Sequence, residues 1–163
     1  MLGRFIRVVY TYQIARLIDF GGGWLLPSDY WKREALRWLE DAFEDLSVAE
    51  DLLRGGHHSA SCFHSQQAAE KAVKAALYSN RVEAKGHSIL ELLESLGRVT
   101  GLRLEELYED ARLLDRHYAP TRYPNLHPSI SLPSHKLYSR EDAERCIGSA
   151  RKIVNCMKRL LED

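Results

Sequence analysis

Apolar residues recur every three or four positions through most of the chain from Trp31 onward, which is the spacing of one face of an α-helix. The clearest stripe predicts a first helix of about 24 residues, which Ser28 or Asp29 caps and which Gly55-Gly56 ends. Because the stripe is continuous, we expect this helix to lie along a hydrophobic core. Its apolar positions are Ala35, Leu39, Ala42, Leu46, Ala49 and Leu53.

Four more helices are predicted after the first one. An alanine-rich segment over residues 59–79 favours a helix whose small side chains let its neighbours approach closely, so we interpret it as the centre of a bundle. A shorter helix follows a capping pattern at Ser88, a fourth begins near Leu104 and reaches Tyr118, and the last follows Ser139. No convincing strand interrupts them, so the sequence predicts an all-α, up-and-down helical bundle of four to five helices.

The N-terminal residues do not continue this pattern. Residues 8–12 favour a strand and residues 13–18 favour a helix, before Gly21-Gly22-Gly23 interrupts any regular element. We therefore expect residues 1–28 to form an appendage and residues 29–163 to form the helical domain. The appendage is interpreted as an arm that packs on its own subunit or on a partner, with association with a membrane surface as the alternative.

The bulk composition narrows the classes of function. The chain has 163 residues, enough for one ordinary domain, and 45% of them are hydrophobic, which argues against wholesale disorder. Lys and Arg together number 23, as do Asp and Glu, so the formal net charge is zero. There is thus no global basic field for nonspecific nucleic-acid binding, and contact with a nucleic acid would need a local patch.

The cysteines and the lack of long apolar runs indicate a cytoplasmic protein. Cys62, Cys146 and Cys156 are scattered and odd in number, which is typical of small buried side chains in a reducing compartment. No apolar run approaches ~18 residues, so we expect no transmembrane helix. The N-terminus also lacks the compact apolar core and cleavage site of a signal peptide.

Two Arg/His pairs occur in residues 112–127, where a helical pattern gives way to a proline-rich loop. Arg112 and His117 are five positions apart, and so are Arg122 and His127. An arginine can hold a phosphate through two parallel hydrogen bonds, and a histidine can take or give a proton near neutral pH. These are sufficient parts for metal-free RNA cleavage, and the same parts can bind a nucleotide without cleaving anything.

Several of these candidates also have a purely structural interpretation. Arg112 can pair with Glu109 on the same helix. Tyr118 and Tyr123 can serve in packing, with their hydroxyl groups in water. The spacing of the residues leaves both interpretations open.

A polar face on the predicted helix over residues 59–79 likewise has two interpretations. It is either a solvated or ion-paired surface, or a wall of a cleft shared with the 112–127 stretch. Its residues are Gln67, Glu70, Lys71 and Lys74. His57 and His64 would share a helix face nearby, but no carboxylate or cysteine lies at a matching step, so we expect no metal and no cofactor.

Two motifs resemble signatures of the HEPN domain family. Residues 67–77, Gln-Ala-Ala-Glu-Lys-Ala-Val-Lys-Ala-Ala-Leu, look like the central helix of that family, and Tyr118-x-x-Thr-Arg-Tyr-Pro-Asn125 looks like its second signature, in the Arg-Tyr-Pro subgroup. The resemblance spans most of the chain beyond the appendage. It implies a bundle similar to the helical domain of nucleotidyltransferases, commonly a homodimer. It also implies a small, separately encoded nucleotidyltransferase partner, in an arrangement resembling a toxin–antitoxin pair.

The resemblance leads to three hypotheses of function. The first is a nucleotide- or RNA-binding protein that acts with the nucleotidyltransferase. The second is a metal-independent RNase toxin that cleaves RNA through an Arg/His pair, and the third is a non-catalytic dimerising module. The candidate catalytic residues are Arg122, His127, Arg112 and His117. The candidate nucleotide-binding residues are Arg122, Tyr118, Tyr123, Gln67, Lys71 and Lys74.

Overall fold

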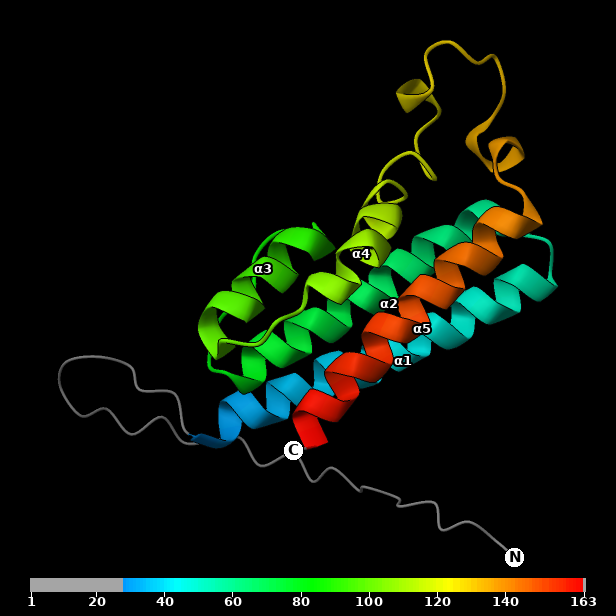
Figure 1. Ribbon diagram of the computed structural model, residues 1–163. Coiled ribbons are helices and arrows are strands. Elements are labelled where there is room, and N and C mark those ends of the chain that lie inside the picture. Colours follow the sequence, from blue (N-terminus) through cyan, green and yellow to red (C-terminus); the bar gives the residue numbers. More distant parts are fainter. Residues whose placement is uncertain (1–27, 163) are drawn as a thin grey trace, which may run out of the picture.

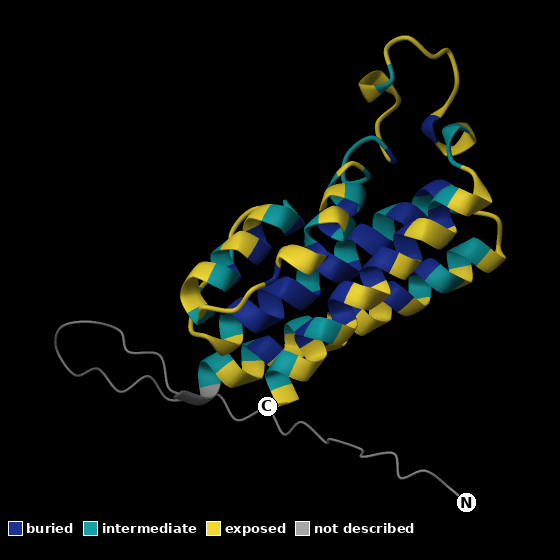
Figure 2. Cartoon of the chain, viewed as in Figure 1, coloured by how far each residue is buried: buried dark blue, intermediate teal, exposed yellow. Residues whose placement is uncertain are grey.

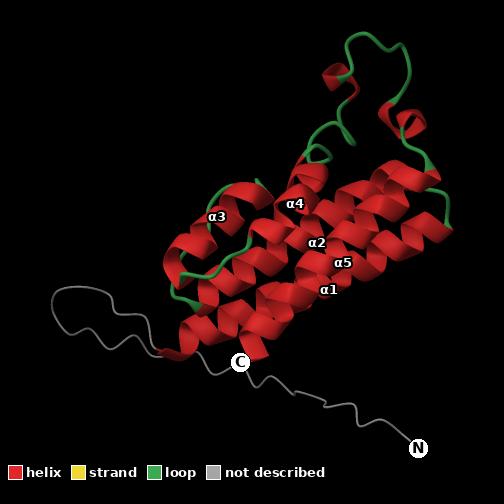
Figure 3. Ribbon diagram, viewed as in Figure 1, coloured by secondary structure: helices red, strands yellow, loops and turns green. Residues whose placement is uncertain are grey.

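The computed structural model describes residues 28–162, and all regular elements in that part of the chain are helices (Figure 3). This confirms the predicted all-α bundle, while the predicted appendage lies outside the described residues apart from Ser28. The α-helices are α1 (Ser28–Arg54), α2 (His58–Ser79), α3 (Ile89–Thr100), α4 (Tyr108–Asp115) and α5 (Arg140–Glu162). Short 3-10 turns span Glu105–Leu107, Pro124–Leu126 and Ser134–Leu137.

The central helix of the bundle is α2, because it contacts each of the other four α-helices. The long helices α1 and α5 run beside it, and α3 and α4 lie together next to it (Figure 1). Five alanines of α2 are at most 1% exposed, so their small side chains let the neighbouring helices approach closely. They are Ala68, Ala69, Ala72, Ala75 and Ala76. The predicted central position of this helix is confirmed.

The predicted apolar stripes face a common core between the helices (Figure 2). On α1 the stripe is buried from Ala35 to Ala49 and partly buried at Leu53, and on α5 it is buried from Ala143 to Met157. Each large apolar side chain that is fully buried stabilises the fold by about 1.5–3 kcal/mol. No helix between residues 28 and 162 combines the length and the apolarity that a membrane crossing requires.

Two of the predicted helix starts are capped as their sequences indicate. The Ser88 hydroxyl accepts from the backbone N–H of Glu91 at 3.3 Å at the start of α3. At the start of α5, Ser139 Oγ accepts from the N–H of Asp142 at 3.1 Å, and Asp142 Oδ2 accepts from the N–H of Ser139 at 2.8 Å. The backbone hydrogen bond from Ser139 lowers the pKa of the Asp142 carboxyl below its usual value.

The fourth helix differs from its prediction at the C-terminal end. It was expected to reach Tyr118, but α4 ends at Asp115. Pro120 explains the difference, because its ring would clash with a helical carbonyl four residues earlier and it has no N–H to donate. Asp115 then serves the neighbouring helix: its carboxylate accepts from the backbone N–H of Ile89 at 2.7 Å and from the Ser88 hydroxyl at 2.8 Å.

The connection between α4 and α5, residues 116–139, extends beyond the end of the bundle (Figure 1). Most of its residues are exposed, but its first part is anchored (Figure 2). Thr121 Oγ1 donates to the carbonyl of His117 at 2.7 Å, and the hydroxyl of Ser59 on α2 donates to the carbonyl of Thr121 at 2.7 Å. These two hydrogen bonds fix the backbone next to Arg122.

Candidate functional site

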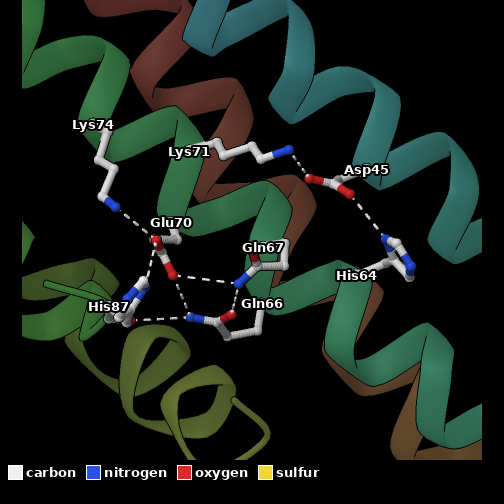
Figure 4. Close-up of polar contacts among 8 residues, drawn as sticks. All are labelled: Asp45, His64, Gln66, Gln67, Glu70, Lys71, Lys74 and His87. Carbon is white, nitrogen blue, oxygen red and sulfur yellow. Dashed lines mark hydrogen bonds and ion pairs between the residues drawn. The ribbon is translucent and has the colours of Figure 1, made fainter. Parts of the chain in front are cut away.

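A buried ion pair on α2 forms the centre of the candidate site (Figure 4). Glu70 and Lys74 lie one helical turn apart, and Lys74 Nζ donates to Glu70 Oε1 at 2.8 Å. Only 4% of the Glu70 side chain and 8% of the Lys74 side chain are exposed. Lys74 also lies over the Trp38 ring of α1, 5.3 Å from its centroid. The face predicted as solvated or ion-paired is therefore ion-paired and buried at these two residues.

Three further donors converge on Glu70 (Figure 4). Gln66 Nε2 lies 3.1 Å and Gln67 Nε2 lies 3.4 Å from Glu70 Oε2. The Nδ1 atom of His87, in the turn before α3, lies 3.1 Å from Glu70 Oε1. Because a carboxylate can only accept, this ring nitrogen is the donor. Both oxygens of Glu70 are thus satisfied, and Glu70 orients the imidazole of His87.

The imidazole of His87 connects Glu70 to the loop that follows α4. The rings of His87 and Tyr118 are stacked, with their centroids 4.7 Å apart and 16° between their planes. The Arg122 guanidinium lies over the Tyr118 ring at 4.9 Å from its centroid, and Arg122 Nε donates to the Tyr118 carbonyl at 3.1 Å. A continuous series of contacts therefore runs from the buried Lys74–Glu70 pair to Arg122 at the surface.

Arg122 is an exposed cation held against aromatic rings. Besides Tyr118, its guanidinium lies 4.4 Å from the ring centroid of Phe63 and 5.2 Å from that of Tyr123. No carboxylate in the part of the chain that the structure describes pairs with it. Exposed cation–π contacts contribute about 0.5–1 kcal/mol each, so the rings orient the guanidinium. Its terminal nitrogens remain for two parallel hydrogen bonds to a phosphate or carboxylate.

A second carboxylate, Asp45 on α1, binds a lysine and a histidine of α2 (Figure 4). Its Oδ1 atom lies 2.8 Å from His64 Nδ1, and its Oδ2 atom lies 2.6 Å from Lys71 Nζ. Burial raises the pKa of Asp45, but the hydrogen bonds from His64 and Lys71 outweigh burial and lower the pKa below its usual value. This group ties α1 to α2.

Comparison with known proteins identifies the family to which this bundle belongs. Residues 35–160 match the family model described as "HEPN domain". The chain belongs to the HEPN family. It is 38% identical to TT1696 from Thermus thermophilus, whose crystal structure aligns with a TM-score of 0.74 over 78% of this chain and 98% of that one. The crystal structure of ST0689, an archaeal HEPN homologue, is 34% identical and aligns with a TM-score of 0.66 over 78% of this chain and 98% of that one.

This HEPN chain is also similar to a protein whose name refers to a toxin. The protein named "Putative toxin MJ1304", from Methanocaldococcus jannaschii, is 29% identical over 134 residues, which cover 77% of this chain and 87% of the relative. The predicted family and fold are therefore confirmed by the family match and by the solved structures.

The first predicted Arg/His pair is not joined by any hydrogen bond or ion pair within the described residues. Arg112 pairs with Glu109 one turn away, as its structural interpretation predicted. It also lines an open hollow of about 490 Å³ between α4 and α5, together with Arg116 and Arg145. His117 lies on the turn that leaves α4, and two thiols are close to its ring.

The second pair, Arg122 and His127, is likewise not joined by a hydrogen bond in residues 28–162. His127 Nε2 donates to the carbonyl of Pro120 at 2.9 Å, so this ring nitrogen is already engaged by the backbone of its own loop. Arg122 contacts the aromatic rings instead. Within residues 28–162, neither predicted pair therefore places a base next to a phosphate-binding cation.

The predicted nucleotide-binding residues fall into three places. Arg122, Tyr118 and Tyr123 lie together on the loop. Gln67 and Lys74 contact Glu70 and reach this loop only through His87. Lys71 is engaged by Asp45 in the other polar group. The loop is thus the part of the predicted site that is both assembled and exposed.

Sequence reasoning did not assign His87 or Phe63 to the site. Both lie far along the chain from the loop, and each supplies a ring, His87 to Tyr118 and Phe63 to Arg122. The only local signal for His87 is its position between a glycine and the Ser88 cap, which fixes it beside the start of α3. No local pattern singles out Phe63.

Proposed function

We propose that this HEPN chain binds the phosphate of a nucleotide or of RNA at the loop around Arg122. The observation that carries the proposal is the guanidinium itself, which is exposed, is oriented by the Phe63, Tyr118 and Tyr123 rings, and has no carboxylate partner among the described residues. An exposed guanidinium without a carboxylate partner can bind an anion without first breaking an ion pair. Planar arginine suits phosphate oxygens because two of its N–H groups point in parallel.

The surroundings of Arg122 favour a nucleotide over a bare anion. Tyr123 is 49% exposed, so part of its ring is available to stack on a base. Stacking of a base on an aromatic side chain contributes about 1–3 kcal/mol and tolerates any base. Together, one arginine and one exposed ring supply a phosphate contact and a base contact within a single loop.

The proposed biological setting is a toxin–antitoxin-like pair in which a separately encoded small nucleotidyltransferase is the partner and this chain forms a homodimer. The similarity to "Putative toxin MJ1304" supports the toxin side of this pair. The HEPN match supports the nucleotidyltransferase partner and the homodimer, because the resemblance to that family implies both. The formal net charge of zero also offers little repulsion against self-association.

Binding is favoured over RNA cleavage by the positions of the two histidines. His117 lies beside two cysteines, and His127 donates to the carbonyl of Pro120. Neither histidine contacts the arginine of its pair within one chain. A general base has to lie within hydrogen-bond reach of the proton that it removes. RNase activity through either pair would therefore need an arrangement that residues 28–162 of one chain do not contain.

The test is a binding titration with the four nucleoside triphosphates and with short single-stranded RNA. Loss of the charge-assisted hydrogen bonds in Arg122→Ala is expected to weaken binding by roughly 10- to 100-fold. Arg98→Ala is the matched control, since Arg98 is also an exposed arginine, in the last turn of α3. Equal affinities for wild type and Arg122→Ala would refute the proposed site. RNA incubated in EDTA and examined for 2′,3′-cyclic phosphate ends tests the RNase alternative.

A further inference from the structure

Two cysteines and a histidine meet at a point where three segments of the fold converge. Cys62 comes from α2, Cys146 from α5 and His117 from the turn after α4, and their side-chain ligand atoms all lie within 4.8 Å of one another. Both cysteines are 0% exposed. The cluster shares no residue with the Glu70 and Asp45 groups, and the function proposed for Arg122 does not use it.

One polar atom of this cluster, on the His117 ring, is buried without a hydrogen-bond partner among the described residues. The atom is His117 Nδ1, and buried polar atoms nearly always have such a partner. The deprotonated form of a cysteine is the one that binds metals.

We propose that Cys62, His117 and Cys146 bind one thiophilic divalent metal ion, of which Zn²⁺ is the best match. Thiolate and imidazole ligands are typical of zinc, and three protein ligands leave its fourth position to water or another small ligand. Binding releases the thiol protons, and the two thiolates then balance the 2+ charge of the ion inside the fold.

The geometry requires only a small contraction of the cluster. Zinc–sulfur bonds of about 2.3 Å and zinc–nitrogen bonds of about 2.0 Å place the two sulfurs and the nitrogen of a tetrahedral site roughly 3.5 to 3.8 Å apart. Atoms now separated by up to 4.8 Å have to approach by about 1 Å. Rotation of the three side chains about their χ angles provides movements of this size.

Metal binding at this point would also act on the loop that carries Arg122. The carbonyl of His117 accepts the hydroxyl of Thr121, the residue directly before Arg122. An ion held between α2, α5 and His117 would therefore fix the first turn of the loop to two long helices of the core. We expect the bound ion to raise the melting temperature and to slow proteolysis within residues 116–139.

The experiment uses the full chain without a histidine tag, reduced and freed of metal by a chelator. Zn²⁺ is titrated against a chromophoric chelator, and Co²⁺ is added separately to look for thiolate-to-cobalt charge-transfer absorption. We expect one ion per chain. Loss of a direct ligand in Cys146→Ser or His117→Gln is expected to weaken Zn²⁺ binding by at least roughly 100-fold, since loss of an outer contact already costs about 10- to 100-fold. Cys156→Ser, outside the cluster, is the matched control and keeps wild-type affinity.

A second measurement on the wild type avoids any dependence on how the variants fold. Bound Zn²⁺ is expected to protect Cys62 and Cys146 from alkylation under mild denaturant, while Cys156 reacts as before, as read by mass spectrometry of peptides. The proposal is overturned if the reduced protein takes up no stoichiometric Zn²⁺, or if Zn²⁺ binds equally well to Cys62→Ala/Cys146→Ala. Formation of a Cys62–Cys146 disulfide by the oxidised protein, without metal uptake by the reduced one, would overturn it in favour of a redox pair.

Discussion

Two carboxylates of this HEPN domain, Glu70 and Asp45, have partners of the same types and lie in different surroundings. Each binds one lysine of α2 and one histidine: Glu70 binds Lys74 and His87, and Asp45 binds Lys71 and His64 (Figure 4). Glu70 and Lys74 are deeply buried, whereas the His87 side chain is 57% exposed and stacks on Tyr118. Asp45 and Lys71 are more exposed than Glu70 and Lys74, and they join α1 to α2.

Residue types alone do not show which of the two ion-paired groups contacts the loop that carries Arg122. Both groups include residues from one polar face of α2. Its residues are three or four positions apart: Gln67, Glu70, Lys71 and Lys74. What separates them is the element that supplies the histidine. His87 comes from the turn before α3 and faces the loop, whereas His64 comes from α2 itself. We therefore expect changes at Glu70 to affect both stability and ligand binding, and changes at Asp45 to affect stability alone.

The largest expected effect is that of Glu70→Ala. The substitution leaves the ammonium of Lys74 buried without its carboxylate, and such a change typically costs about 3–5 kcal/mol in the free energy of unfolding. Urea denaturation followed by circular dichroism measures it. Glu70→Ala/Lys74→Met is the control: it removes the stranded charge and is expected to recover a large part of the loss. A single-variant loss below about 1 kcal/mol would mean that Lys74 can reach water.

Asp45→Ala is expected to have a smaller effect, of about 1–2 kcal/mol in the free energy of unfolding. Lys71 and His64 have side chains that are 26% and 31% exposed, so both can exchange the lost carboxylate for water. The same denaturation experiment measures the loss, and Asp41→Ala, an exposed position on α1, is the control. If nucleotide affinity fell together with stability in Asp45→Ala, the proposed division between the two groups would be wrong.

His87→Ala against His64→Ala compares the two histidines directly. Removal of His87 takes the stacked ring away from Tyr118, so the loop loses one contact that orders Arg122. We expect nucleotide affinity to fall by roughly 3- to 10-fold, in line with the ~0.5–1.5 kcal/mol that an aromatic pair contributes. His64→Ala is expected to leave affinity unchanged. Calorimetric titration with the preferred nucleotide measures both, and equal losses would contradict the comparison.

The helices were predictable from the sequence because the signals that form them are local. Apolar spacing located α1, α2 and α5, and the capping serines at 88 and 139 located two helix starts. The end of α4 was placed too late, because the apolar stripe continues to Tyr118 while Pro120 acts on the backbone ahead of it. The spacing of apolar residues predicts which residues share a helix face. It does not predict the position at which the helix ends.

The candidate site was only partly predictable, because its contacts depend on how the helices pack. The Arg-Tyr-Pro loop was located, and Arg122, Tyr118 and Tyr123 do lie together. The contact between His87 and Glu70 joins residues 17 positions apart, and no spacing rule relates them. Cys62 and Cys146 are even further apart in the sequence, although they meet in the fold. Motifs based on cysteine spacing detect only cysteines that are close in the chain, so they could not predict this contact.

The smallest expected effect is a difference in acid stability between the wild type and Asp45→Asn. The hydrogen bonds from His64 and Lys71 lower the pKa of Asp45 in the folded protein, although burial raises it. A carboxyl with a lowered folded pKa contributes stability above its unfolded pKa of about 3.9, and this contribution is lost as the pH falls through the folded pKa. The wild type should therefore lose more stability than Asp45→Asn between about pH 4 and pH 2. Urea denaturation at a series of pH values measures the difference. Parallel curves for the two proteins would mean that Asp45 has the same pKa in the folded and unfolded chain, and that its contacts with His64 and Lys71 do not outweigh burial.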